Sequence, residues 1–341
     1  MIRQGVFVVF GLAQAFTLNV GAGLQEPNVG AGLPPSREAL RGTSQSRPPE
    51  IPISNLKTDA TLAIALAPGA AASDDAIWIP DPTAGTVVRI EAKDNRISAP
   101  IAVGATPCAS LAVAFASVWV PACGDRIIAR ITPSDLKVSA KAAIAVADPD
   151  GRIAAGVGSI WVVTDRKGIV SRLDPDTNAA VAEIHVAGGA ASVVFASDAL
   201  WVTSGGRNHV TRINPHNNQI VETIEVGPNP GRVAAADGAV WTLNRGNGSV
   251  TRIDAATNKV VTTIIVGSEV AAGEIAAGEG SVWISAPGAP LVRIDPRTNK
   301  VAQRFSGDGG GAVLVAHGSL WLAAGPQLTW RLDPKLVAGM R

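Results

Sequence analysis

Short apolar runs recur along the chain at intervals near forty residues, separated by polar and glycine-rich segments. Each run contains one tryptophan: Trp78, Trp119, Trp161, Trp201, Trp241, Trp283 and Trp321. Successive tryptophans are 41, 42, 40, 40, 42 and 38 residues apart. An arginine follows each of them after ten or eleven residues: Arg89, Arg130, Arg172, Arg212, Arg252, Arg293 and Arg331. A period near forty built from short β-rich segments is typical of a propeller blade, so seven copies predict an all-β, seven-bladed β-propeller.

The repeat between residues 230 and 267 predicts four strands and their turns. Strands are expected at Val233–Ala235, Ala239–Leu243, Ser249–Ile253 and Val260–Val266, because each is rich in apolar or β-branched residues. The segment Asn244–Gly248 separates the second strand from the third and supplies residues that tolerate a positive φ. Four antiparallel strands of this kind form one blade.

The reversal between the third and fourth strands has a regular sequence. It reads Asp-Pro-Asp-Thr-Asn at 174–178, Asn-Pro-His-Asn-Asn at 214–218 and Asp-Pro-Arg-Thr-Asn at 295–299. The first residue can bond to the backbone of its own turn, proline fixes φ near −65°, and the last asparagine tolerates the left-handed region. Since the pattern recurs in the repeats, we interpret it as turn chemistry rather than as a metal-binding loop.

The ends of the repeat array predict how the ring closes. The last repeat, residues 312–333, supplies three strands, and a matching fourth strand precedes the first repeat at 60–66. We therefore expect residues 60–66 to complete the last blade and to leave no open sheet edge.

The N-terminus has the pattern of an export signal. Arg3 precedes an apolar stretch, Val6–Val20, and small residues that suit cleavage follow at 20–22. A transmembrane anchor is the alternative reading, but the stretch is short and polar for a bilayer about 30 Å thick. We expect a signal peptide at 1–22, an irregular Pro/Ser/Gly-rich linker at 23–58, a propeller at 59–336 and a tail at 337–341. The protein would then be secreted or periplasmic, without a transmembrane anchor.

Composition narrows the range of partners. Apolar residues make up 47% of the chain, enough for a core. Lys and Arg total 29 against 28 for Asp and Glu, so no basic excess indicates a nucleic-acid partner. The sequence contains no nucleophile elbow, phosphate-binding loop or haem-attachment motif.

The repeats resemble those of a known group of propellers. Segments such as Gly238–Asn244, Val250–Asp254 and Thr263–Ser268 are similar to YVTN-type repeats and to the streptogramin B lyase (virginiamycin B lyase-like) propellers. The resemblance covers residues 60–336. It implies a seven-bladed propeller that either binds a ligand or partner or uses a divalent metal, with His and Glu catalysis near the channel mouth.

Residues that occur in every repeat are interpreted as structural. The seven tryptophans are expected to pack between neighbouring blades, although a stacking platform for sugars or bases is an alternative. The seven arginines need partners that offset their desolvation. For these we expect the aspartate two residues further on, at Asp174, Asp254, Asp295 and Asp333.

The two cysteines of the chain are not part of the repeat. Cys108 and Cys123 lie on the first and second strands of the second repeat, on either side of a predicted hairpin turn. They should face each other across the sheet, close enough for a disulfide. A free buried pair and a two-cysteine metal site are the alternatives.

Singular charged residues mark the candidate functional face. Loops that enter the first strand and leave the second strand of each repeat open at the same end of the channel. Candidate anion ligands there are Arg152, Arg166, Arg207, His209, Arg232 and Arg245. Glu269 and Glu274, in a longer loop of the sixth repeat, could instead hold Mg²⁺ or Ca²⁺. The remaining interpretation is a mixed-charge rim without a ligand.

Two functions follow from these observations. The first is an exported, monomeric binding or scaffold module that presents its channel face to a small anionic ligand or a partner protein. The alternative is a metal-dependent lyase or lactonase resembling streptogramin B lyase. A set of His and Glu ligands converging on the channel would distinguish the second from the first.

Overall fold

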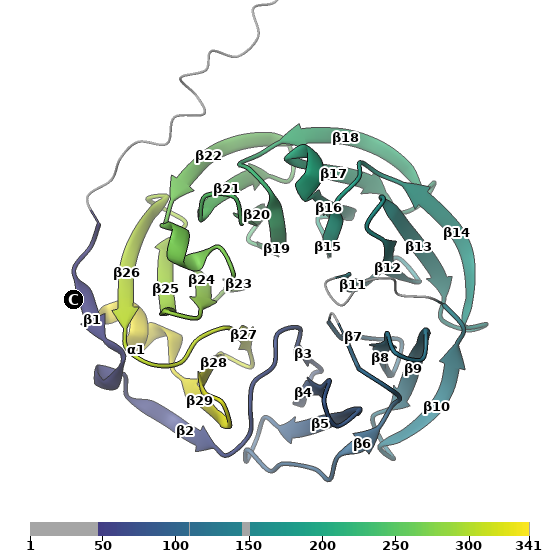
Figure 1. Cartoon of the computed structure of the whole chain (residues 1–341), viewed down its shortest axis with the longest axis horizontal. Coiled ribbons are helices and arrows are strands. Elements are labelled where there is room, and N and C mark those ends of the chain that lie inside the picture. The colour runs from purple at the N-terminus through teal and green to yellow at the C-terminus, as the bar shows by residue number, and fades with distance from the viewer. Residues whose placement is uncertain (1–46, 109, 145–150, 341) are drawn as a thin grey trace, which may run out of the picture. The chain divides into compact units, whose positions relative to one another are not determined.

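Seven blades of antiparallel strands surround a central channel (Figure 1). The computed structural model describes residues 47–340 except 109 and 145–150. The expected signal peptide and the expected linker as far as residue 46 lie outside these residues. No helix in the described part of the chain is long and apolar enough to cross a bilayer. The predicted fold class, an all-β seven-bladed propeller, is confirmed.

The first three blades follow one another along the chain, each with its first strand beside the channel. Blade 1 contains β3 Ala71–Ala72, β4 Ala76–Asp81, β5 Thr86–Glu91 and β6 Ile101–Ala102. Blade 2 contains β7 Ala112–Ala114, β8 Ser117–Ala122, β9 Ile127–Thr132 and β10 Lys137–Ala142. Blade 3 contains β11 Ile153–Gly156, β12 Ser159–Asp165, β13 Ile169–Asp174 and β14 Ala179–His185.

The next four blades continue the ring. Blade 4 contains β15 Ala190–Ala196, β16 Ala199–Ser204, β17 His209–Asn214 and β18 Gln219–Glu225. Blade 5 contains β19 Pro230–Ala236, β20 Ala239–Asn244, β21 Ser249–Asp254 and β22 Lys259–Ile265. Blade 6 contains β23 Glu274–Gly278, β24 Ser281–Ala286, β25 Ala289–Asp295 and β26 Lys300–Ser306. Blade 7 contains β27 Val313–Ala316, β28 Ser319–Gly325 and β29 Leu328–Leu332.

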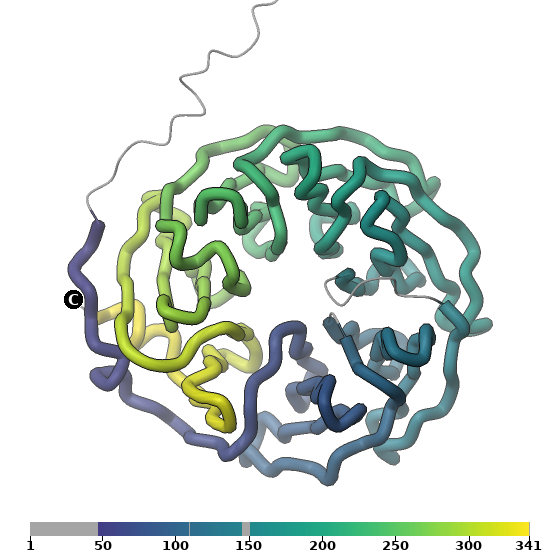
Figure 2. The backbone as a smooth tube through the Cα atoms, in the orientation of Figure 1, coloured from purple at the N-terminus to yellow at the C-terminus, as the bar shows by residue number. Residues whose placement is uncertain are grey.

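The N-terminal strand β2, Thr58–Leu62, completes blade 7. It pairs antiparallel with β29, with Thr61 opposite Trp330. The purple and yellow ends of the described part of the chain therefore meet in one sheet (Figure 2). This is the predicted closure, and the strand begins two residues earlier than expected.

An additional strand lies within the segment expected to be an irregular linker. β1, Glu50–Pro52, pairs parallel with β26 and gives blade 6 a fifth strand, with buried Ile51 opposite buried Phe305. A short 3-10 turn, η1 Ile53–Asn55, leads from β1 to β2. Ordered structure thus begins before residue 59. After the last strand, Pro334–Gly339 form helix α1, which spans the expected boundary between propeller and tail.

The turns between third and fourth strands have the predicted chemistry. The closing asparagines have positive φ values of 57°, 62°, 61° and 55° at Asn178, Asn218, Asn258 and Asn299. At the turn start, Asp254 Oδ1 accepts hydrogen bonds from the amides of Ala256 and Thr257 at 3.1 and 2.8 Å. The amide of Thr257 contributes most to holding the pKa of Asp254 below its ordinary 3.8. This stabilisation is complete above pH 3.8 and is lost as the pH falls through the lower folded-state pKa.

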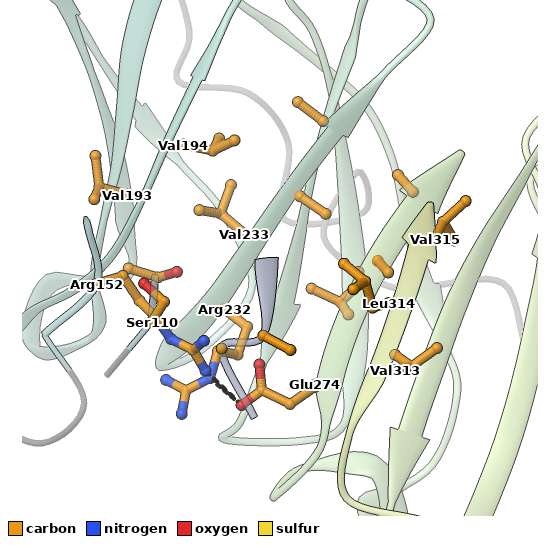
Figure 3. A pocket seen from close by; sticks show the side chains of 18 of the residues that line it. Ser110, Arg152, Val193, Val194, Arg232, Val233, Glu274, Val313, Leu314 and Val315 are labelled. Carbon is orange, nitrogen blue, oxygen red and sulfur yellow. Dashed lines mark hydrogen bonds and ion pairs between the residues drawn. The ribbon is translucent and has the colours of Figure 1, made fainter. Parts of the chain in front are cut away.

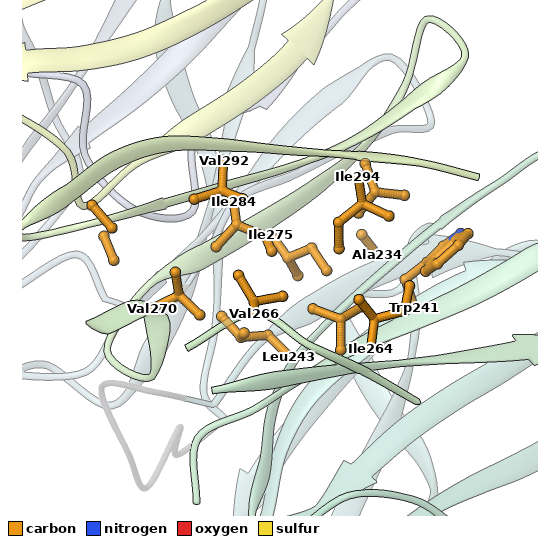
Figure 4. Packing of buried hydrophobic residues seen from close by; sticks show 14 of the residues in the cluster. Ala234, Trp241, Leu243, Ile264, Val266, Val270, Ile275, Ile284, Val292 and Ile294 are labelled. Carbon is orange, nitrogen blue, oxygen red and sulfur yellow. The ribbon is translucent and has the colours of Figure 1, made fainter. Parts of the chain in front are cut away.

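The seven repeated tryptophans are core residues, as predicted. Each is at most 1% exposed. Trp241 lies at the interface of blades 5 and 6, in one cluster with Ile264 of its own blade and with Ile275 and Ile294 of the next (Figure 4). Tryptophan therefore joins successive blades, since neither sheet could bury its apolar face alone.

The four repeated arginines for which an aspartate partner was predicted bind other groups, whereas Arg89 does pair with the acidic residue two positions further on, Glu91, and with Asp75. Each of the seven repeated arginines lies directly opposite its tryptophan on the adjacent strand, with the guanidinium carbon 4.9 to 6.0 Å from the ring centroid. Most then reach the next blade: Arg252 Nη1 donates to Pro296 O at 2.6 Å and to Asn299 Oδ1 at 2.7 Å. Arg172 donates likewise to Pro215 O at 3.1 Å. Asp174, Asp254 and Asp295 cap their own turns instead, and Asp333 caps the start of helix α1.

Arg293 of blade 6 has no turn in the next blade from which to take a hydrogen-bond acceptor. Blade 7 has no turn between its third strand and its fourth, because the fourth comes from the other end of the chain. Arg293 of blade 6 therefore donates to Gln303 Oε1 at 2.9 Å, within its own blade. The amide nitrogen of Gln303 in turn donates to Ala338 O and Met340 O, each at 2.8 Å. Helix α1 thus takes the place of the missing turn.

Serine or alanine two residues before each tryptophan predicts a difference in stability between blades. Ser159 Oγ accepts from Arg172 Nε at 2.8 Å, whereas buried Ala239 leaves Arg252 Nε without a partner. We expect Ala239→Ser to raise the free energy of unfolding by about 1 kcal/mol, because a buried donor gains an acceptor. Ser159→Ala should lower it by about 1–2 kcal/mol. Urea unfolding would measure both changes, and a loss of stability in Ala239→Ser would contradict the proposed hydrogen bond.

Cys108 and Cys123 form a disulfide within blade 2. Their Cα atoms are 5.8 Å apart, and the residues beside them, Pro107 and Ala122, form an isolated bridge. The bond closes a loop with a sequence separation of 15, which constrains the unfolded chain by about 3 kcal/mol. The two alternative interpretations, a free buried pair of cysteines and a two-cysteine metal site, are therefore wrong. A disulfide is consistent with an oxidising compartment outside the cytosol.

Candidate functional site

A cavity of about 310 Å³ lies along the central channel, between the first strands of the blades. Polar and charged side chains gather at one level of it, and apolar side chains line the rest (Figure 3). The size is at the lower end of the range for small-molecule sites, about 300–1,000 Å³.

The polar level is a ring to which each blade contributes one residue. Every member stands nine residues before a repeated tryptophan: Gly69, Ser110, Arg152, Ser192, Arg232, Glu274 and Ala312. Five consecutive blades, 2 to 6, therefore present a polar side chain at this level, blade 1 presents Gly69, and Ala312 of blade 7 is buried outside the cavity lining. We call these seven residues the polar ring.

Three members of the polar ring form a buried ionic cluster. Arg152 Nη2 is 2.6 Å from Glu274 Oε1, and Arg232 Nε is 2.7 Å from the same oxygen. Arg232 Nη1 also donates to Gly231 O at 3.0 Å. The three side chains are 9%, 7% and 12% exposed. In the low dielectric of the channel such charge-assisted contacts are stronger than at a protein surface.

Both serine positions of the polar ring are fixed by hydrogen bonds, Ser110 through its side chain and Ser192 through its backbone amide. Ser110 Oγ accepts a hydrogen bond from the amide of Ile153 in the next blade at 3.0 Å. The amide of Ser192 donates to Thr203 Oγ1 at 3.0 Å, which fixes the start of β15 against β16. Ser192 stands on β15 and Ser110 stands two residues before β7, and these bonds fix both positions against a neighbouring strand.

Apolar side chains follow the polar ring along the channel. One position further on stand Ala70, Leu111, Ile153, Val193, Val233, Ile275 and Val313, and all of them line the cavity. Val194, Leu314 and Val315 extend this lining (Figure 3). The cavity therefore combines one charged level with an apolar wall, an arrangement that suits an amphipathic molecule.

Four of the predicted anion ligands lie outside the cavity lining. Arg166 is exposed in the turn after β12, and Arg207 is exposed in the 3-10 turn η2, Gly205–Arg207. His209 is half-buried at the start of β17, opposite Glu225. Arg245 is half-buried beside Gly231, where a Cβ would lie 2.3 Å from its Cδ. The structure thus brings together Arg152 and Arg232 and places the other four elsewhere.

The two glutamates suggested for metal binding contact different arginines. Glu274 belongs to the polar ring, whereas Glu269 lies in the 3-10 turn η3, Ser268–Val270. Glu269 Oε1 is 2.6 Å from Nη1 of Arg304, a guanidinium that is only 2% exposed, and 3.3 Å from Arg47 Nη2. Within the described residues, no group of three His, Cys, Asp or Glu is placed to hold a metal ion.

Sequence reasoning missed the serines of the polar ring. Ser110 and Ser192 have no charge and sit in small-residue segments, so composition does not single them out. Their signal is the constant distance to the tryptophan. Because the repeat fixes which residue of each first strand reaches one level of the channel, equivalent positions around the ring form the site.

Comparisons with known proteins identify the fold. The family model described as "Domain of unknown function (DUF5074)" matches residues 127–288, from the start of β9 to two residues beyond β24, which is 162 of 341 residues. No curated protein matches the sequence significantly.

Solved structures give broader matches. Virginiamycin B lyase from Staphylococcus aureus is similar with a TM-score of 0.65 and 19% identity, covering 80% of this chain and 97% of that one. A streptogramin B lyase structure has a TM-score of 0.63 and 19% identity, with coverages of 79% and 93%. Hydrazine synthase from Kuenenia stuttgartiensis has a TM-score of 0.54 and 14% identity, with coverages of 64% and 73%. The chain is a seven-bladed β-propeller with the fold of the streptogramin B lyases.

Proposed function

We propose that this protein is an exported binding module whose channel takes a small molecule with a carboxylate and an apolar body. The carboxylate would contact Arg152 and Arg232 of the polar ring, and the apolar body would occupy the channel beyond Val193 and Val233. The observation that supports this most directly is the pair of buried guanidinium groups facing a single glutamate at one end of an apolar cavity.

The chemistry of the arginines favours a carboxylate. A guanidinium presents a planar set of N–H donors that matches two carboxylate oxygens, and it stays charged when buried. Glu274 already shows how a carboxylate oxygen fits between Arg152 and Arg232, at 2.6 and 2.7 Å. A ligand carboxylate of the same geometry would use the same donors.

The test compares a straight-chain carboxylate with its neutral analogue. We expect octanoate to bind the protein in titration calorimetry, and octanol to bind at least about tenfold more weakly, since it lacks the charge-assisted hydrogen bonds. Arg152→Met and Arg232→Met should each weaken octanoate binding by about 10–100-fold, equivalent to about 1.5–3 kcal/mol.

Arg297→Met is the matched control. It also removes one guanidinium, but from a side chain that is 87% exposed in the turn before β26. It should leave octanoate binding unchanged. Equal binding of octanoate and octanol, or equal loss in all three variants, would contradict the proposal.

A metal-dependent lyase or lactonase remains the competing function, and thermal unfolding separates the two. A metal that binds the folded state at about 100 times its Kd stabilises it by about 2.7 kcal/mol. Because Glu269 and Glu274 both contact arginines, we expect the same midpoint in EDTA and in excess Mg²⁺ or Ca²⁺. A rise of several degrees with either metal would favour the enzyme.

A further inference from the structure

The outermost strands of blades 3 to 5 present apolar side chains to solvent. No described strand pairs with the outer edges of β14, β18 and β22. Large apolar residues exposed on these strands are Val181, Ile220, Val221, Val260, Val261 and Ile265. A bare strand edge beside apolar side chains is a template for adding another strand.

In blade 6 an added strand already covers the equivalent outer edge. The outermost strand β26 is covered by β1, which runs parallel to it with Glu50 opposite Arg304 and Pro52 opposite Ser306. The added strand buries Ile51 against the sheet, and Phe305 beneath it is 1% exposed. A short extended segment from outside the blade is therefore enough to cover this edge.

The edge of β22 is the equivalent surface in blade 5. Arg252 lies opposite Thr262, as Arg293 lies opposite Gln303 in blade 6. Residues 263–265 therefore correspond to residues 304–306, the part of β26 that β1 covers. On β22 this part includes Ile265, which is 45% exposed, and Val261 nearby is 49% exposed.

We propose that the outer edge of β22 is a docking site for an extended segment of a partner protein, added as a parallel fifth strand in the way that β1 is added to blade 6. Main-chain hydrogen bonds would give affinity, and alternate side chains of the segment would meet Val261 and Ile265. This site is separate from the channel and does not depend on the proposed carboxylate site.

Charge beside the edge indicates the chemistry of the partner. β18 of the neighbouring blade lies next to β22, and it exposes Glu222 and Glu225. Lys259 is the only charged residue on β22 itself, at its first position. Apolar residues alternating with lysine or arginine would place the apolar side chains against β22 and the basic ones near the two glutamates.

The probe is a fluorescent eight-residue peptide of alternating valine and lysine, titrated into the full-length protein by anisotropy at low salt. We expect saturable binding that weakens about tenfold in Val261→Lys and in Ile265→Lys, because each places a charge in the apolar contact. A peptide with two central valines replaced by proline should also bind about tenfold more weakly, since proline removes ladder hydrogen bonds.

Ile97→Lys is the matched control variant. Ile97 is 41% exposed and stands 19 residues after Trp78, the same repeat position as Val260 after Trp241, but in blade 1. It should bind the peptide like the unsubstituted protein. Absence of saturable binding, equal weakening in Ile97→Lys, or equal binding of the proline peptide would overturn the proposal. Light scattering of the protein alone that showed a dimer lost in Val261→Lys would do so too, since the edge would then be occupied by a second copy.

Discussion

Replacing Trp241 with alanine is expected to lower the free energy of unfolding by about 3–5 kcal/mol. The indole is 1% exposed and fills the interface of blades 5 and 6 (Figure 4). Its removal leaves a cavity between two sheets whose strands cannot approach each other to fill it. The stacking of Arg252, 5.0 Å from the ring centroid, is lost as well. Equilibrium unfolding in guanidinium chloride measures the loss.

Trp330→Ala is the matched substitution. Trp330 is the eighth tryptophan of the sequence and lies outside the repeat, and it is only partly buried against the blade 6–7 cluster. It should lose markedly less stability than Trp241→Ala. If the two variants lost the same amount, the repeated tryptophans would not be the main contacts between blades.

A double-mutant cycle measures how strongly the Trp241 indole and the Arg252 guanidinium are coupled in stabilising the fold. The guanidinium of Arg252 lies over Trp241 and also donates to Pro296 and Asn299 of the next blade, so we expect Arg252→Met and Trp241→Ala to be non-additive. We expect a coupling energy of about 0.5–2 kcal/mol between them. Strict additivity would show that stacking and the hydrogen bonds to the next blade are independent.

The period of the sequence was sufficient to predict the blades, their order and the closure through β2. It predicted poorly what lies between blades. Asp254 was expected to pair with Arg252 because it stands two residues away, yet the acceptors are Pro296 and Asn299 of the next blade. When each repeat of the sequence is analysed alone, only contacts within that repeat can be predicted. Contacts between copies appear only when position n of one repeat is compared with position n of the next.

The polar ring illustrates the same point for function. Charge alone suggested Arg152 and Arg232, but it suggested Arg166 and Arg207 equally, and those two are exposed in loops. Their distances from the repeated tryptophans differ from the nine residues shared by the ring. The strand register decides the level at which a side chain enters the channel. The distance of a residue from the repeated tryptophan gives this register, so the sequence already contained the information.

The strand β1 could not be predicted by these means. Its residues lie in a proline-rich stretch without period, and proline is poorly suited to a central strand. At the edge of a sheet this objection disappears, because an edge strand needs hydrogen bonds on one side only. Tertiary context, in this case the bare edge of β26, decides the conformation of residues 50–52.

Glu274→Gln is expected to strengthen carboxylate binding by about tenfold. The glutamate accepts from both Arg152 and Arg232 through a single oxygen, so any ligand carboxylate must compete with it for the same donors. Glutamine keeps an oxygen acceptor at that position but removes the negative charge. The repulsion between two carboxylates at one end of the channel is thereby relieved, while the two guanidinium groups remain.

The same substitution should destabilise the unliganded protein, because it leaves buried guanidinium groups with less compensation. Thermal unfolding with and without octanoate therefore gives two opposite changes: a lower midpoint alone and a larger shift on adding the ligand. If Glu274→Gln instead weakened octanoate binding as much as Arg152→Met does, Glu274 would act by orienting the arginines rather than by competing. The sign of the change in octanoate affinity thus distinguishes two roles of Glu274. Weaker binding would mean that Glu274 holds the arginines in place for a ligand anion, and stronger binding would mean that Glu274 itself occupies the anion site.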